Sequence, residues 1–483
     1  MKKLFGTDGM RGEAGRFPLD APTVETVGRS LARHLTERAV GDERAPRIVI
    51  GRDTRESGEW MERAFVAGAR AAGAECESAG VITTPGVAFL TRTLPADAGV
   101  VISASHNPYH DNGIKIFAPT GRKLDDATEQ RIEADIRQAH GARDEASNAR
   151  DEAHATASRD GEIPARSFDA ASDTGQRGDT ARRAVALQAR YVDYLAEAVA
   201  PGLRLDNLRL VVDCANGAAS HLAPALFERL GAEVRAVGNT PDGRNINHEC
   251  GSLYVEQLRD QVAAAGAHLG VAFDGDADRA LFVDARGQVV DGDATLWVMA
   301  KSLQARGELA GAQVVATVMS NIGLELALAS RDIQMLRADV GDKYVLEELL
   351  RTGASLGGEQ SGHIIFPRVS LAGDGMMTTL FLLRAMQETG ESLEALHAGF
   401  TRYPQVLVNV RVCEKRPFAE VAEIAAEERR IKDALAGQGR LLLRYSGTEP
   451  LARVMIEGRH QEEIERLAHA LATVIEGALG KEK

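Results

Sequence analysis

The chain has 483 residues, of which 44% are hydrophobic, and its 57 basic and 70 acidic side chains give a formal net charge of −13. A chain of this length is expected to fold into about three or four domains rather than one. The negative net charge argues against broad affinity for nucleic acid or anionic membranes, so an anionic ligand would need a locally basic cleft.

The cysteines and the N-terminus exclude several further classes. Cys76, Cys214, Cys250 and Cys413 are widely spaced and form no Cys-x-x-Cys pair, which argues against a zinc site or a redox motif. The first residues lack the apolar core of a signal peptide, and no apolar run approaches membrane-spanning length. We therefore expect a soluble cytoplasmic protein.

Helix and strand patterns alternate in the first part of the chain. Residues 48–50 and 98–102 have the composition of buried strands. The apolar side chains that share one face of a preceding helix are Val24, Val27, Leu31 and Leu35. This alternation predicts a parallel α/β layer.

The second of these strands runs into a polar turn, Val-Ile-Ser-Ala-Ser-His-Asn-Pro at residues 101–108. Ser105 is a hydroxyl nucleophile that could carry a phosphoryl group, with Ser103 as its rival. A hydrolase elbow needs glycine two residues on either side of the serine, and those positions hold Ser103 and Asn107. A plain turn with incidental serines is the remaining alternative.

The composition changes between about residues 140 and 183 to Ala, Arg, Asp, Glu, Ser and Gly, with Ala-Arg-Asp-Glu-Ala at 142 and again at 149. Such a segment is typical of an inserted, partly disordered linker. The repeat could also continue a solvated helix, although it lacks the apolar seam of a coiled coil. We assign no chemistry to it.

The middle of the chain has a cluster of acidic residues between two predicted strands. Strands are predicted at 208–212, 269–273 and 281–283, with a helix at 222–230, and the sequence Asp274-Gly-Asp-Ala-Asp-Arg279 lies between the last two strands. Alternation with small residues lets a tight loop aim three carboxylates inward, and carboxylates are ligands that Mg²⁺ prefers. A calcium loop would need Gly at its sixth and Glu at its twelfth position, where Arg279 and Ala285 stand.

The last part contains two further units. One starts near Asp291, with a strand at 314–318 and a Gly-rich loop at 357–363. The other starts near Tyr403, with strands at 406–412, 441–444 and 453–456, a helix from Phe418 and a closing helix. The predicted fold is three mixed α/β-sheet domains (1–184 with the linker, 185–290 and 291–400) around a central cleft, plus a smaller C-terminal α+β domain (401–483).

Taken together, the motifs resemble those of the α-D-phosphohexomutases over nearly the whole chain outside the linker. The serine turn and the Asp loop are joined by Phe-Gly-Thr-Asp-Gly-Met-Arg-Gly at 5–12, Gly-Gly-Glu-Gln-Ser-Gly-His at 357–363 and Arg-Tyr-Ser-Gly-Thr-Glu-Pro at 444–450. They look most like the branch that acts on glucosamine phosphates. Val-Gly-Asp-Lys-Tyr-Val at 340–345 fits too, with Lys343 where that branch often has Arg.

The resemblance implies an isomerase that interconverts glucosamine 6-phosphate and glucosamine 1-phosphate. A phosphorylated Ser105 would give its phosphoryl group to one sugar hydroxyl and recover it from the other end of a 1,6-bisphosphate intermediate. The cofactor would be Mg²⁺. The activator would be glucosamine 1,6-bisphosphate or glucose 1,6-bisphosphate. The product would feed UDP-N-acetylglucosamine synthesis for cell-wall precursors.

The resemblance also implies a role for individual residues. The phosphoryl-transfer machinery would comprise Ser105, His106, Lys115, Arg11 and Arg279. The Mg²⁺ ligands would be a phosphoserine oxygen of Ser105 together with Asp274, Asp276 and Asp278. Groups that hold the sugar would be Glu359, Ser361 and His363, and groups that grip the phosphate that is not reacting would be Arg444, Ser446, Gly447, Thr448 and Arg453. Lys115 must lose a proton to act as a base, which a cationic or desolvated setting would promote.

Several alternatives stay open at this point. A phosphomannomutase or phosphoglucomutase would keep the same loops and choose another sugar, and Gln360 favours the amino sugar. A non-catalytic sugar-phosphate sensor or a metal-dependent phosphatase is also possible. Because the bisphosphate must turn end for end, we predict a hinge near residues 395–405. The oligomeric state is open, with a homodimer among the options.

Overall fold

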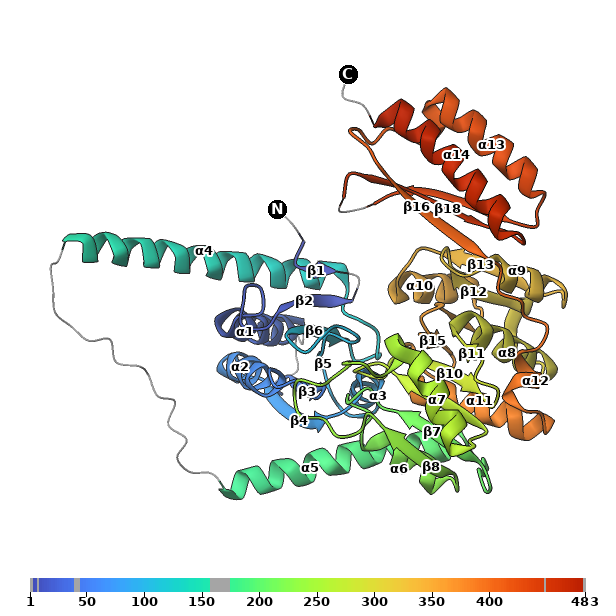
Figure 1. Cartoon of the computed structure of the whole chain (residues 1–483). Helices are drawn as coiled ribbons and strands as arrows, with labels where there is room; N and C mark the ends of the chain where they lie inside the picture. The colour runs from blue at the N-terminus through green and yellow to red at the C-terminus, as the bar shows by residue number, and fades with distance from the viewer. Residues whose placement is uncertain (1–2, 7, 39–43, 157–173, 447–448, 481–483) are drawn as a thin grey trace. The chain divides into compact units, whose positions relative to one another are not determined.

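A computed structural model describes residues 3–6, 8–38, 44–156, 174–446 and 449–480 (Figure 1). They form two compact units, one made of Met1–Thr317 with Arg337–Leu396 and the other of Val318–Leu336 with His397–Lys483. The chain passes between the units at residues 317–318, 336–337 and 396–397, and the last of these crossings lies inside the segment where we predict a hinge. The motion itself and the four domain boundaries stay predictions.

The first sheet has six strands in the order β1-β2-β6-β5-β3-β4, of which β3 is parallel to β4 and β5 and the others are antiparallel. The strands are β1 (Phe5–Gly6), β2 (Gly9–Glu13), β3 (Arg47–Arg52), β4 (Glu75–Val81), β5 (Ala98–Ile102) and β6 (Asp111–Phe117). The helices are α1 (Ala21–Arg38), α2 (Gly58–Ala71), α3 (Thr84–Thr93), α4 (Asp126–Thr156) and α5 (Thr174–Asp193), followed by the π-helix η1 (Tyr194–Val199).

Helices α1 and α2 lie side by side because glycine lets their backbones approach (Figure 1). A Cβ atom at Gly28 of α1 would lie 2.1 Å from the carbonyl oxygen of Phe65 in α2. The predicted face of α1 forms a core with β3 and β5, and Val24, Val27 and Leu31 are fully buried there. The periodicity therefore identified this face correctly.

The predicted linker at 140–183 is helical at both of its ends. Residues up to Thr156 continue α4, and residues from Thr174 belong to α5. These ends have the continued helix that the sequence left open as an alternative to a partly disordered linker, because Ala, Arg and Glu are strong helix formers and no proline interrupts them there. The part of the linker at 157–173 lies outside the described residues.

The second sheet has the order β11-β10-β9-β7-β8, with β7 parallel to β8 and β9, and with β10 antiparallel to β9 and β11. Its strands are β7 (Arg209–Asp213), β8 (Glu233–Val237), β9 (Leu269–Phe273), β10 (Ala280–Asp284) and β11 (Val289–Val290). Its helices are α6 (Leu222–Arg229), η2 (Ser252–Tyr254) and α7 (Val255–Ala265). The Asp loop joins β9 to β10, as predicted from the sequence.

The third sheet has the order β13-β12-β14-β15 and is again mixed, since β14 is parallel to β12 and antiparallel to β15. Its strands are β12 (Gln313–Thr317), β13 (Gln334–Ala338), β14 (Gly357–Gly358) and β15 (Ile364–Ile365). The helices of this part are α8 (Gly292–Ala305), η3 (Ala310–Ala312), α9 (Ile322–Ala329), α10 (Asp342–Thr352), α11 (Gly375–Thr389) and α12 (Leu393–His397). Carboxylates cap two of them: Asp291 accepts from Ala294 N at the start of α8, and Asp374 from Met377 N at the start of α11.

The C-terminal sheet is antiparallel, with the order β16-β18-β17. Its elements are β16 (Gln405–Arg411), η4 (Phe418–Glu420), α13 (Ala422–Leu435), β17 (Arg440–Tyr445), β18 (Leu451–Glu457) and α14 (Gln461–Leu479). Three mixed α/β sheets and a smaller α+β part confirm the predicted fold class. No helix among the described residues is long and apolar enough to cross a membrane.

The buried carboxylate of Glu457 connects several elements of the second unit by hydrogen bonds. It accepts hydrogen bonds from the Asn321 side chain at 3.3 Å, from Ile322 N at 3.1 Å and from Arg440 Nε at 3.0 Å, and it is 0% exposed. It therefore joins the start of α9 to β17 and β18.

We expect Glu457→Ala to lower the free energy of unfolding of this unit by about 3 kcal/mol, because it leaves a guanidinium and two donors without their acceptor. Urea denaturation followed by circular dichroism measures the change. Glu462→Ala, on the exposed first turn of α14, is the control and should change the free energy by no more than about 0.5 kcal/mol. Equal effects of the two variants would refute this assignment.

Candidate active site

The serine turn lies at the carboxyl end of β5, an edge where ligands commonly bind in α/β sheets. Ser105 is fully buried and has φ 53°, a left-handed conformation that is unusual for a residue other than glycine. Its hydroxyl donates to Asp274 Oδ2 at 2.5 Å. The fold therefore brings together two motifs that are 169 positions apart in the sequence.

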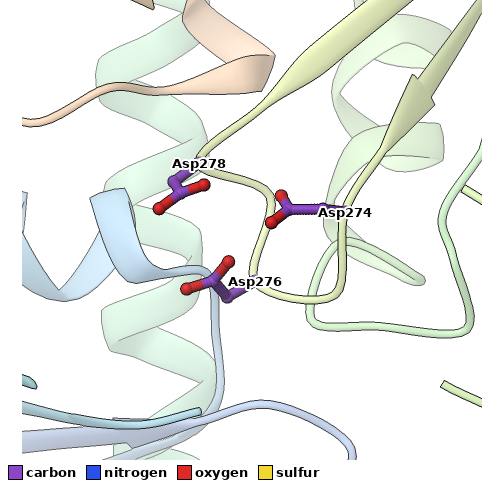
Figure 2. Close-up of side chains that lie close together, drawn as sticks. All are labelled: Asp274, Asp276 and Asp278. Atoms are coloured by element: carbon purple, nitrogen blue, oxygen red, sulfur yellow. The ribbon is translucent and has the colours of Figure 1, made fainter. Parts of the chain in front are cut away.

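The three carboxylates of the Asp loop converge on one small space, as Figure 2 shows. Each of Asp274, Asp276 and Asp278 offers an oxygen within 4.8 Å of the others, and all three residues are buried. Oδ1 of Asp276 and Oδ1 of Asp278 have no hydrogen-bond partner in the part of the chain that the structure describes. Burial, Asp278 and Asp276 raise the pKa of Asp274 well above its ordinary value.

This donor set fits a hard divalent cation. A cation such as Mg²⁺ would coordinate the buried carboxylate oxygens that accept no hydrogen bond from the described residues, and it would relieve the repulsion among the three carboxylates. The surroundings also hold the ligands in place: Thr84 donates its hydroxyl to Asp276 Oδ2 at 2.5 Å, and Thr84 N donates to Asp276 O at 3.0 Å.

Glycine at position 275 allows the Asp loop to approach the serine turn. A Cβ atom there would lie 2.6 Å from the carbonyl oxygen of Ser105 and 2.8 Å from the side-chain nitrogen of Asn247. The next small residue, Ala277, has φ 55° and is buried. Glycine adopts such a left-handed conformation without steric cost, so the alanine of this chain stands at a position that favours glycine.

Lys115, on β6, is buried among carboxylates. Its Nζ lies 2.8 Å from Asp276 Oδ2, 3.5 Å from Asp278 Oδ2 and 3.0 Å from Asp8 Oδ2. Burial alone lowers the pKa of Lys115, but Asp276, Asp8 and Asp278 outweigh it and raise the pKa well above its ordinary value. In this environment Lys115 is a cation and a proton donor.

His106 has the opposite electrostatic setting. Its Nδ1 lies 3.3 Å from Ser105 Oγ. Burial lowers the pKa of His106 to about 4, and the guanidiniums of Arg279 and Arg11 contribute to this. The imidazole is therefore neutral at pH 7 and able to accept a proton.

Arg11 and Arg279 bring positive charge to the same place. Arg11 pairs with Asp8, and Arg279 Nε lies 3.8 Å from Asp278 Oδ1. The Nε–H groups of both side chains are buried and have no hydrogen-bond partner among the described residues. Together with burial, both guanidiniums lower the pKa of His106, the neighbour of Ser105, and their Nε–H groups are suited to an anion such as a phosphate.

The loop at 357–363 packs against the Asp loop, since Ala280 N donates to Gly362 O at 3.1 Å. Glu359 is partly exposed and accepts from Gly341 N at 3.1 Å, and Ser361 is partly exposed too. His363 is buried with Nδ1 3.6 Å from Asp278 Oδ1. Burial lowers the pKa of His363, but Asp278 outweighs it and raises the value to about 9.

The predicted phosphate-gripping residues belong to the second unit and are described within it alone. Arg444 on β17 is the cross-strand partner of Arg453 on β18. Arg453 donates to Ser446 Oγ at 3.4 Å, and its buried Nε has no partner among the described residues. Gly447 and Thr448 lie outside the described residues.

Sequence reasoning missed several residues that surround the serine and the carboxylates, namely Asp8, Asp53, Arg55, Thr84 and Asn247. A signal existed for some of them. Asp8 belongs to the motif at 5–12, and the run Gly-Arg-Asp-Thr-Arg at 51–55 follows a predicted buried strand. Polar residues at that end of a strand are candidates for a site at the sheet edge.

Models of one family match the chain from end to end. The descriptions are "Phosphoglucomutase/phosphomannomutase, alpha/beta/alpha domain I" at residues 2–142, domain II at 189–287, domain III at 291–403 and the C-terminal domain at 407–474. Among curated proteins, the chain is 48% identical over 480 residues to a protein from Solibacter usitatus, covering 99% of this chain and 100% of that protein. It is 46% identical over 479 residues to a protein from Syntrophotalea carbinolica, covering 99% and 98%. Both relatives are called phosphoglucosamine mutase.

Solved structures share the fold. A phosphoglucomutase/phosphomannomutase family protein from Burkholderia thailandensis matches with a TM-score of 0.74 at 24% identity, covering 99% of this chain and 97% of that one. The N-acetylphosphoglucosamine mutase of Aspergillus fumigatus, in complex with GlcNAc-6P and magnesium, matches with a TM-score of 0.62 at 20% identity, covering 98% and 96%.

Proposed function

The chain belongs to the phosphoglucomutase/phosphomannomutase family, and from this premise we propose that it interconverts glucosamine 6-phosphate and glucosamine 1-phosphate through a phosphorylated Ser105. The observation that carries the proposal is the contact of the buried Ser105 hydroxyl with Asp274, beside two further carboxylates and unpartnered guanidinium donors. The two relatives that share nearly half of its residues support the choice of the amino sugar.

Asp274, Asp276 and Asp278 would hold Mg²⁺ together with a phosphoserine oxygen. When bound, the ion supplies charge withdrawal from the phosphoryl group. Phosphoryl transfer otherwise depends mainly on positioning and charge stabilisation. Arg11 and Arg279 offer both through Nε–H groups that have no hydrogen-bond partner among the described residues.

Proton movement is divided between two residues in different settings. Neutral His106 can take the hydroxyl proton when Ser105 accepts a phosphoryl group, since its Nδ1 is 3.3 Å from the oxygen. Lys115, held as a cation by its three carboxylates, can donate a hydrogen bond to an oxygen that leaves, and it can give up its proton only as that oxygen becomes a strongly basic alkoxide, because its raised pKa makes it a weak acid. Glu359 and Ser361 are partly exposed on the neighbouring loop and can hydrogen-bond to sugar hydroxyls.

The remaining roles complete the cycle. Arg444, Ser446, Gly447, Thr448 and Arg453 would grip the phosphate that is not reacting. Glucosamine 1,6-bisphosphate or glucose 1,6-bisphosphate would first charge Ser105. The product would feed UDP-N-acetylglucosamine synthesis in the cytoplasm.

We expect kcat/KM for glucosamine 6-phosphate to exceed that for glucose and mannose 6-phosphates by about tenfold or more, since polar recognition of a substituent discriminates strongly. Coupled assays of the three 1-phosphates measure this, with free phosphate monitored in parallel. Equal or better use of mannose phosphate would replace the amino-sugar assignment by the phosphomannomutase alternative. Stoichiometric release of free phosphate would indicate a phosphatase.

A further inference from the structure

Arg55 lies beneath the serine turn and is 1% exposed. Its Nε donates to Asp53 Oδ2 at 2.9 Å, and the rest of its guanidinium faces the backbone of the turn. The carbonyl oxygens that accept from it are Ser105 O at 3.0 Å, Asn107 O at 2.8 Å, Asp111 O at 3.0 Å and Pro108 O. All five N–H donors of one side chain are thus directed at Asp53 and at four backbone carbonyls between Ser105 and Asp111, the first residue of β6.

Asp53 completes a closed ring of hydrogen bonds around Ser105. The Ser103 hydroxyl donates to Asp53 Oδ2 at 2.6 Å and accepts from Ser105 N at 3.0 Å. Both Asp53 and Ser103 are 0% exposed. Ser105 is therefore held at its carbonyl by Arg55 and at its N–H by Ser103, and Asp53 connects the two holding groups.

The ring explains how Ser105 keeps an unfavourable backbone conformation. A left-handed φ of 53° persists only where the surroundings over-determine it. Asn247 reinforces the same geometry from the second sheet's side, because its side-chain nitrogen donates to Ser105 O at 2.8 Å and to Asn107 O at 3.1 Å. The resulting conformation directs the Ser105 hydroxyl to Asp274.

We propose that Arg55 is a positioning residue for phosphoryl transfer, which acts with Asp53 and Ser103 by fixing the turn that presents the Ser105 hydroxyl. The inference rests on the proposed function and extends it to Arg55, Asp53 and Ser103. Among the described residues, these three make no hydrogen bond to the loop at 357–363 or to the three aspartates of the Asp loop. The inference also assigns Ser103 a holding role, because its hydroxyl is already engaged on both sides.

A purely structural role and a positioning role predict different kinetics. Loss of a buried ion pair lowers the amount of folded enzyme, whereas loosening of the turn lowers the rate of transfer in enzyme that is fully folded. Lysine would keep the positive charge beside Asp53 but offers three donors on a single atom, so it cannot reach the four carbonyls together.

The test compares Arg55→Lys and Arg55→Met with Arg52→Gln. For each variant, kcat and KM are measured, and thermal melting gives the fraction of folded protein by which kcat is normalised. Arg52 is the matched control because it is the last residue of β3, shortly before Arg55, where it pairs with Glu62 at 2.9 Å and makes no hydrogen bond to the serine turn among the described residues. We expect kcat to fall about 10²-fold in both Arg55 variants with KM close to that of wild type, and Arg52→Gln to turn over normally. Wild-type kcat in Arg55→Lys, or an equal loss in Arg52→Gln, overturns the proposal.

If Arg55→Met does not fold, Ser103→Ala provides a second measurement, because it removes only one hydroxyl of the ring. We expect about a tenfold lower kcat with phosphate still on Ser105, and an unchanged kcat counts against the ring. Failure of the proposed function is recognised separately, since wild-type enzyme would then not isomerise glucosamine phosphates. In that case the rate at which glucose 1,6-bisphosphate phosphorylates Ser105, followed by peptide mass spectrometry, still compares wild type with the Arg55 variants.

Discussion

Ser105→Ala is expected to lower kcat for glucosamine 6-phosphate isomerisation at least about 10⁴-fold, because the variant lacks the atom that receives and returns the phosphoryl group. The side chain is fully buried and its hydroxyl makes contacts with Asp274 and His106. Removing one small hydroxyl leaves the backbone bonds of the turn in place. The loss should therefore appear in kcat, with the melting temperature close to that of wild type, and a coupled assay of glucosamine 1-phosphate measures it.

Peptide mass spectrometry supplies the companion measurement. Wild-type enzyme incubated with glucose 1,6-bisphosphate should carry phosphate on Ser105, and Ser105→Ala should carry none on the peptide that contains residues 103 and 105. Ser103→Ala is the matched control, and its phosphate should remain on Ser105. Phosphate found on Ser103, or a Ser105→Ala variant that isomerises at the wild-type rate, would contradict the assignment.

Much of the fold could be predicted because burial leaves a local pattern in the sequence. The apolar runs at 98–102 and 269–273 became β5 and β9, since strands buried on both faces need continuous hydrophobic residues. The alternation of aspartates with small residues at 274–278 likewise predicted a loop that turns three carboxylates inward. That Ser105 lies close to this loop could be predicted from the family resemblance and from the position of both motifs at strand ends.

The partners of these residues could not be predicted, because they depend on which loops the tertiary fold brings together. Nothing local in Arg55 shows that four carbonyl groups of another loop surround it. The charge state of Lys115 is a second case: the sequence shows a lysine on a strand, and only packing against Asp8, Asp276 and Asp278 decides that its pKa rises. The helical ends of the 140–183 segment show the reverse, since local helix propensity outweighed a composition typical of disorder.

Removal of divalent cations by EDTA is expected to lower turnover about 10²- to 10⁴-fold, and added Mg²⁺ should restore it, because a bound cation contributes several kcal/mol of charge stabilisation to phosphoryl transfer. The carboxylate trio is the basis for this expectation, since Asp276 and Asp278 each have a buried oxygen that accepts no hydrogen bond from the described residues. A cation that binds only the folded protein also stabilises it, by about 2.7 kcal/mol at a hundred times its Kd. Thermal melting with and without MgCl₂ therefore reports binding independently of activity.

Asp276→Asn separates this site from nonspecific effects of the ion, because it keeps the shape of the side chain and removes one of the three converging charges. The variant should show a smaller rise in melting temperature with MgCl₂ than wild type, and Asp260→Asn, at an exposed position of α7, should show the full rise. If MgCl₂ stabilises Asp276→Asn as much as wild type, the cation binds elsewhere. If EDTA-treated enzyme turns over at the undiminished rate, the cation has no part in the reaction.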